Sequence, residues 1–189
     1  MRLFIAIELP DFLRRSLSDL SRNLTLADIP PKSFVRAENL HITIKFIGEV
    51  VDPDLSRVCG ALKQIPSTGS IRLTPDHVEC LPERGPVRVI GVGLTGDLDR
   101  LQALYDSIEN VSELLGVRRE RRRFFPHVTI ARLRRTLSPA VRPSLERVAV
   151  QDSPGKSFDV REFVLMQSIL ERDGARYVPV ARFPFESNP

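Results

Sequence analysis

The chain has 189 residues, of which 42% are hydrophobic and 28% charged, and its formal net charge is +4 at pH 7. This length fits one domain with a real core, and the composition is that of an ordinary globular protein. No apolar run approaches the roughly 18 residues that a membrane span needs, and the first apolar run ends at Glu8, too early for a signal peptide. We therefore expect a cytoplasmic protein without a membrane partner, whose Cys59 and Cys80 are small apolar core residues.

Apolar periodicity and turn residues predict alternating strands and helices. The predicted strands cover Arg2–Glu8, Leu40–Ile47, Ser70–Leu81, Val87–Leu94, Val128–Leu133, Phe158–Leu170 and Arg176–Phe183. The predicted helices cover Pro10–Leu24, Pro53–Ile65, Leu98–Leu115 and Pro139–Val150, with a loop over Thr25–Ser33. We expect Asp52 to cap the second helix, Gly116 to end the third, and Arg172-Asp173-Gly174 to turn between the last two strands.

A short motif occurs twice, as His41-Ile42-Thr43-Ile44 and as His127-Val128-Thr129-Ile130, and it contains two of the three histidines. In a β-strand, side chains two residues apart point to the same face. Each copy therefore places an imidazole beside a hydroxyl, with branched apolar residues on the other face. Two such pairs would supply a proton donor, a proton acceptor and two hydroxyls, which is suitable for acid–base chemistry on a phosphate ester.

The two motifs lie at matching places in a longer repeat. The histidines are 86 residues apart, and the predicted hairpins start 87 residues apart, at Ser70 and Ser157. The repeat predicts an α+β fold of two pseudo-twofold-related lobes, each an antiparallel sheet backed by helices, within a single domain over residues 1–189. The symmetry would bring His41 and His127 to opposite sides of one active groove.

Three segments together resemble the 2H phosphoesterases. Phe34–Gly48 and Phe125–Arg132 are similar to the two motifs of that superfamily, and Met1–Ile7 is similar to the start of its RNA 2′,3′-cyclic phosphodiesterase branch, once named 2′-5′ RNA ligase. This chain has Phe34 where the family usually has tryptophan. It has Ile44 and Ile130 where leucine is frequent, which are volume-conserving changes.

The resemblance implies hydrolysis of a terminal 2′,3′-cyclic phosphate to a 2′-phosphomonoester. It implies that His41 is the proton donor and His127 the proton acceptor, although the sequence itself does not distinguish them. Thr43 and Thr129 would bind the phosphate oxygens. The family places a phosphate-contacting arginine at Arg132, whereas strict alternation turns that side chain away unless a bulge re-aims it.

Other polar residues have weaker assignments. Lys45 shares the predicted face of His41 and is interpreted either as a phosphate contact or as a surface lysine. His77 has no motif around it, and the histidines and cysteines lack metal-ligand spacing, so we predict catalysis without a metal or cofactor. The basic stretch Arg118–Arg123 is either a solvated loop or an electrostatic guide for RNA, and Phe124 or Phe125 could stack a base.

Three alternatives to this function stay open. The same site could perform the reverse reaction, 2′-5′ RNA ligation. The chain could be an RNA-binding module without turnover. It could also act on small cyclic nucleotides or on ADP-ribose cyclic phosphate. We expect the partner to be RNA with a 2′,3′-cyclic phosphate end and the protein to be a monomer.

Overall fold

The computed structural model describes residues 1–25, 29, 33–151, 156–172 and 174–185. Its strands are β1 (Arg2–Glu8), β2 (His41–Glu49), β3 (Ile71–Leu81), β4 (Val87–Gly96), β5 (His127–Leu137), β6 (Phe158–Val160), β7 (Glu162–Glu171) and β8 (Gly174–Pro184). Its helices are α1 (Asp11–Thr25), α2 (Asp52–Leu62), α3 (Leu98–Leu114) and α4 (Arg142–Gln151), with short 3₁₀ turns η2 (Ala37–Asn39) and η3 (Pro139–Val141). The described helices include none that is both long and apolar enough to cross a membrane.

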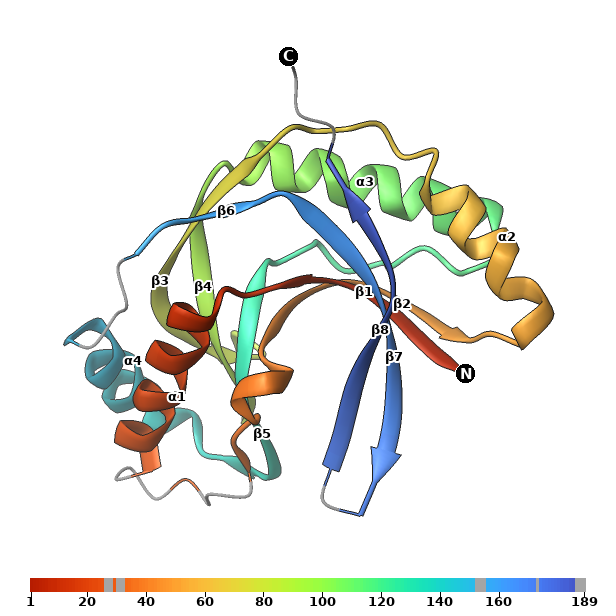
Figure 1. Cartoon of the computed structure of the whole chain (residues 1–189). Helices are drawn as coiled ribbons and strands as arrows, with labels where there is room; N and C mark the ends of the chain where they lie inside the picture. Colours follow the sequence, from red (N-terminus) through yellow and green to blue (C-terminus); the bar gives the residue numbers. More distant parts are fainter. Residues whose placement is uncertain (26–28, 30–32, 152–155, 173, 186–189) are drawn as a thin grey trace.

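All eight strands form one antiparallel sheet in the order β6-β3-β4-β5-β2-β1-β7-β8 (Figure 1). This arrangement confirms the α+β class and the antiparallel pairing. The two motif strands, β2 and β5, are neighbours at its centre, and the order is symmetric about them. The two half-sheets are thus joined edge to edge.

The two half-sheets do not correspond to the two halves of the chain. β3 follows β2 in sequence but pairs with β4 and β6, whereas β7 comes late in sequence and pairs with β1. Each half-sheet therefore combines strands from both halves of the chain.

The predicted strand Phe158–Leu170 is wrong, because the chain breaks at Arg161 into β6 and β7. β6 pairs with β3 near one end of the sheet, and β7 pairs with β1 and β8 near the other. A single residue spans at most about 3.6 Å, so the sheet must curl until these two regions meet. Figure 1 shows β6 running across the molecule toward the start of β7.

The predicted strand Arg2–Glu8 is present with the same bounds, and the other predicted elements are present with shifted ends. Helix α2 begins one residue early, so Asp52 lies in its first turn and Val51 occupies the N-cap without a side-chain cap bond. The prediction of Asp52 as the cap is therefore wrong. Gly116 follows α3 with a positive φ of 84°, as expected for a C-terminal glycine. Parts of the loop Thr25–Ser33 and of the turn around Asp173 lie outside the described residues.

The helices cover one face of the sheet. Helix α1 contacts β5 and α4, whereas α3 contacts β2 and α2. The central residues Ile42 and Val128 are fully buried on this face. Helix α1 buries leucines at helical spacing, namely Leu13, Leu17, Leu20 and Leu24. The motif histidines and threonines alternate with the buried residues and so lie on the opposite face.

Candidate active site

The two motifs meet at one residue pair in the centre of the sheet. Ile42 of β2 lies opposite Val128 of β5 in the antiparallel register. In the same register, His41 lies opposite Thr129 and Thr43 lies opposite His127. Diagonal neighbours in such a pair are about 7–8 Å apart, so the two histidines approach each other across the strand boundary. The fold thus brings all four motif residues together on one face.

Both histidines have the same hydrogen bonds. His41 Nδ1 lies 2.6 Å from the Asn39 carbonyl oxygen, and His127 Nδ1 lies 2.9 Å from that of Phe125. Because a carbonyl oxygen only accepts, Nδ1 carries the proton and the neutral ring is unprotonated at Nε2. Thr43 Oγ1 then donates to His41 Nε2 at 2.9 Å, and Thr129 Oγ1 donates to His127 Nε2 at 3.2 Å. Each Nε2 is therefore the atom that can gain or release a catalytic proton.

Aromatic rings enclose His41. The ring of Phe4 lies 5.1 Å from the imidazole, and Tyr177 meets it edge-on at 5.1 Å between centroids. Asn39, whose carbonyl holds the imidazole, is itself fixed by a hydrogen bond from its side-chain Nδ2 to the Ala175 carbonyl at 2.7 Å. Burial is the main cause that lowers the pKa of His41 to about 4, with smaller contributions from the positive charges of Arg132 and His127. The imidazole is thus neutral at pH 7 in the free protein.

The aromatic neighbour of His127 is more exposed to solvent than those of His41. The ring of Phe125 lies 6.2 Å from its imidazole, and Phe125 is 41% exposed. Burial, followed by the charge of Arg132, lowers the pKa of His127, while the Phe125 carbonyl raises it. Phe124 instead stacks on Tyr105 at 4.2 Å, so of these two phenylalanines it is Phe125 that offers a face to a ligand.

A β-bulge aims Arg132 at the histidines. Ile130 has no partner on β4, because Ala131 pairs with Ile90 and Thr129 with Gly91. Both Ile130 and Ala131 then face the core, where each is fully buried. The alternation is displaced by one residue, and Arg132 joins the face of His127. Its positive charge lowers the pKa of both histidines, which places it electrostatically within the site.

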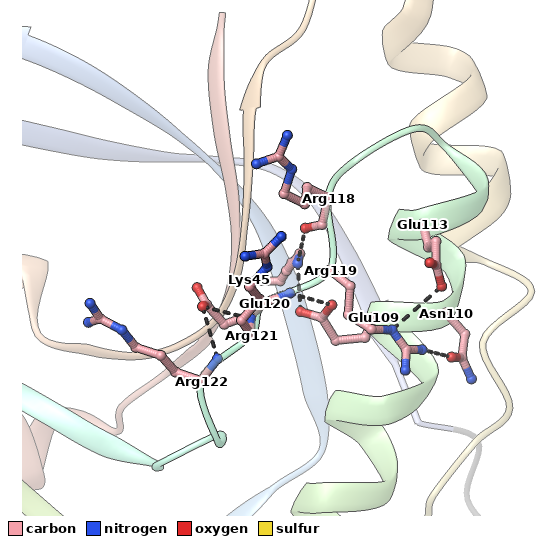
Figure 2. A network of polar contacts seen from close by, with 9 residues as sticks. All are labelled: Lys45, Glu109, Asn110, Glu113, Arg118, Arg119, Glu120, Arg121 and Arg122. Atoms are coloured by element: carbon pink, nitrogen blue, oxygen red, sulfur yellow. Dashed lines mark hydrogen bonds and ion pairs between the residues drawn. The ribbon is translucent and has the colours of Figure 1, made fainter.

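The equivalent bulge in β2 turns Lys45 away from the site. Ile44 has no partner on β1, because Ile5 pairs with Lys45 and Ala6 with Thr43. Lys45 therefore points toward α3, where its Nζ lies 2.6 Å from Glu109 Oε1 and donates to the Arg118 carbonyl at 2.9 Å (Figure 2). Its side chain is 6% exposed. The interpretations of Lys45 as a phosphate contact and as a surface lysine are both wrong.

Two glycines of β4 were missed by the sequence reasoning. A Cβ atom on Gly91 would lie 3.0 Å from His127 Cδ2, so the imidazole packs directly against the backbone of β4 at this glycine. A Cβ on Gly93 would lie 2.4 Å from Glu79 Oε1, on the same face. Glycine inside a strand often marks such a close approach, and the pattern Ile90-Gly91-Val92-Gly93 was the available signal.

Glu79 and His77 lie on this face, one strand beyond β4. His77 Nε2 is 3.0 Å from Glu79 Oε1, and its Nδ1 is 2.8 Å from Asp76 Oδ2. Burial is the main cause that raises the pKa of Glu79 to about 7. Within the described ranges, no three or more histidine, cysteine, aspartate or glutamate side chains gather as metal ligands would.

Paired motifs of this kind on a curled antiparallel sheet define a two-histidine phosphoesterase. A family model described as LigT-like phosphoesterase matches the chain twice, over residues 7–91 and 92–177. The chain therefore belongs to the LigT-like phosphoesterase family, which confirms the resemblance to the 2H phosphoesterases. The two matches also divide the chain into the two halves that the repeat indicated.

Relatives with assigned names support this membership. An RNA 2′,3′-cyclic phosphodiesterase of Archaeoglobus fulgidus is 31% identical over 180 residues, covering 94% of this chain and 96% of the relative. The protein of the same name from Aeropyrum pernix is 32% identical over 162 residues, covering 85% and 90%.

Solved structures share the fold. The TT0787 protein of Thermus thermophilus superposes with a TM-score of 0.79 at 21% identity, over the whole of both chains. LigT of Escherichia coli, crystallised with 3′-AMP, gives a TM-score of 0.74 at 24% identity over 97% of each chain.

Proposed function

We propose that this protein hydrolyses the terminal 2′,3′-cyclic phosphate of RNA to a 2′-phosphomonoester. The observation that carries the proposal is the block of four motif side chains around the Ile42–Val128 pair, in which each histidine has Nδ1 tied to a carbonyl and Nε2 beside a hydroxyl. The names of the relatives in Archaeoglobus fulgidus and Aeropyrum pernix give the substrate class.

The reaction needs two proton movements. Nε2 of His127 takes a proton from water as the water oxygen bonds to phosphorus. The bond between phosphorus and the 3′ oxygen breaks, and this oxygen takes a proton from Nε2 of His41. The products are a 2′-phosphate and a free 3′-hydroxyl. A negatively charged phosphate beside His41 favours the imidazolium, so substrate binding itself raises the pKa of this donor.

The threonines and Arg132 stabilise the developing charge. A hydroxyl has one proton, so a threonine that donates to a phosphate oxygen stops donating to its histidine and leaves Nε2 free for proton exchange. Thr43 and Thr129 each fill this role on a rigid strand. The guanidinium of Arg132 matches the geometry of a phosphate and needs no proton transfer.

The test uses a short oligonucleotide that ends in a 2′,3′-cyclic phosphate, with a chelator present. We expect release of a 2′-phosphate end and a bell-shaped dependence of kcat/KM on pH. His41→Ala and His127→Ala should each lower kcat by about 10²–10⁴-fold, which is the usual contribution of a positioned acid or base. Thr43→Val, Thr129→Val and Arg132→Gln should also lower kcat with the fold intact.

Circular dichroism and the midpoint of thermal unfolding serve as the control that each variant is folded. Full activity in either folded histidine variant would refute the assignment. Turnover that disappears with the chelator and returns with a divalent cation would refute the metal-independent mechanism. Product analysis at high RNA concentration tests for ligation by the same site.

A further inference from the structure

The loop Arg118–Arg123, called here the arginine loop, connects α3 to the strand that carries His127. It contains five arginines and one glutamate in six residues. A loop with this composition would repel itself and lose its shape unless something held it. The structure shows what holds it.

The backbone of the arginine loop is anchored to a buried ion pair. Lys45 and Glu109 are 6% and 3% exposed, and together they bind the backbone of the loop at Arg118 and Glu120. Lys45 Nζ donates to the Arg118 carbonyl at 2.9 Å, and the Glu120 amide donates to Glu109 Oε2 at 3.2 Å. The Glu120 carboxylate then accepts from the amides of Arg121 and Arg122 at 2.9 and 3.2 Å (Figure 2).

These anchors leave most of the arginine side chains without an acidic partner. Arg119 turns back to α3, where it reaches Glu113 at 3.5 Å and donates to Asn110. Figure 2 shows the side chains of Arg118 and Arg122 on the other side of the loop, directed away from α3. Within the described part of the chain, no ion pair forms at any of the four exposed arginines, namely Arg118, Arg121, Arg122 and Arg123.

The loop leads directly into the site. Phe124 fixes the chain by stacking on Tyr105, and the Phe125 carbonyl accepts the Nδ1 proton of His127. Three residues lie between Arg123 and His127, so the four steps along the chain separate their Cα atoms by at most about 14 Å. Arg123 therefore lies within a few nucleotides of a 3′ end held at the two histidines, and Arg121 and Arg122 directly precede it in the chain.

We propose that the arginine loop binds the phosphodiester backbone of single-stranded RNA immediately upstream of the terminal cyclic phosphate. The inference rests on the proposed function and specifies its substrate as a polynucleotide end rather than a small cyclic nucleotide. Exposed guanidinium groups on a loop whose backbone is anchored suit phosphates along a strand, and contacts of this kind depend on charge and spacing rather than on base identity.

The test compares two substrates and two triple variants. One variant is Arg121→Gln with Arg122→Gln and Arg123→Gln. The matched control removes the same charge from α1 and α2, on the face of the sheet opposite the motif residues, through Arg15→Gln, Arg22→Gln and Arg57→Gln. The substrates are 2′,3′-cyclic AMP and a ten-nucleotide RNA with a cyclic phosphate end.

We expect the loop variant to lose about 10- to 100-fold in kcat/KM on the RNA, mainly through KM, and to keep its activity on 2′,3′-cyclic AMP. The control variant should match the wild type on both substrates. The slope of log KM against log salt should fall by about 2 in the loop variant, since each phosphate contact on a single strand contributes about 0.7. Equal losses on both substrates, or no loss on the RNA, would overturn the proposal.

A binding assay separates this inference from the proposed function. Fluorescence polarisation of a labelled RNA that ends in a 3′-phosphate measures how tightly the protein binds this RNA, and it requires no turnover. If neither substrate is hydrolysed but the loop variant binds this RNA more weakly than the control does, the proposed function fails and the RNA-binding role of the loop stands. Equal binding by the two variants would contradict it.

Discussion

At the scale of single residues, the two histidines have the same hydrogen bonds but different surroundings. The rings of Phe4 and Tyr177 enclose His41, whereas among the described residues His127 has one aromatic neighbour, the half-exposed ring of Phe125. The sequence offers no means to distinguish the two motifs, because the difference comes from residues of β1 and β8. Burial therefore makes His41 the histidine whose charge depends more on a bound anion.

We predict that phosphate controls the charge of His41. Its pKa of about 4 in the free protein should rise when inorganic phosphate is added, because the anion stabilises the imidazolium. An NMR titration of the imidazole Cε1 proton, with and without phosphate, measures this. Titration of His41 near its ordinary value of 6.5 without phosphate, and no response to phosphate, would contradict the prediction.

The same pKa predicts how stability depends on pH. The folded-state pKa of about 4 lies below the ordinary value of 6.5, so between these values the unfolded chain binds a proton that the folded chain does not. The free energy of unfolding is insensitive to His41 above pH 6.5 and falls as the pH drops toward 4. In urea titrations, His41→Gln should lose less stability over this window than the wild type, by up to about 3 kcal/mol.

At the scale of elements, the sequence predicted the motif strands but not their bulges. Alternation of apolar and polar residues identified β2 and β5, since each buries one face. A bulge depends on how a strand pairs with its neighbour, and that register is not visible within the strand itself. For this reason, strict alternation placed Lys45 on the site face and Arg132 off it, whereas the structure shows the reverse.

We expect Lys45 and Glu109 to be strongly coupled in their contributions to the free energy of unfolding. It joins β2 to α3 and to the arginine loop within a buried environment, where either charge alone is costly. We predict that Lys45→Met or Glu109→Gln alone lowers the free energy of unfolding by about 3–5 kcal/mol. The double variant should lose clearly less than the sum, because it leaves no uncompensated charge.

A double-mutant cycle in urea checks this coupling. The exposed pair Arg57 and Asp54, at 3.7 Å on α2, provides the matched control, and its coupling should be below about 1 kcal/mol. Additive losses at Lys45 and Glu109 would show that the two charges are not coupled.

At the scale of the whole molecule, the duplication is visible in the sequence but its strand exchange is not. The paired motifs and their regular spacing indicated two related halves. The run Phe158–Leu170 contains neither proline nor glycine, so nothing local marks the break at Arg161. The break follows from long-range pairing, which sends β6 to β3 and β7 to β1. The single-domain prediction therefore depends on whether the halves need each other.

The exchange predicts that neither half folds alone. A fragment of residues 1–86 keeps β3 but lacks β4 and β6, with which β3 pairs, and its β1 lacks β7. It retains a single β1–β2 pair, and an isolated two-stranded sheet is marginally stable at best. We expect this fragment and the fragment 87–189 to show no cooperative unfolding separately and to regain one transition when mixed. The intact chain should unfold in a single transition by circular dichroism in urea. Cooperative unfolding of the fragment 1–86 by itself would mean that the halves are independent domains, and that β3 can be stabilised without its strands from the other half.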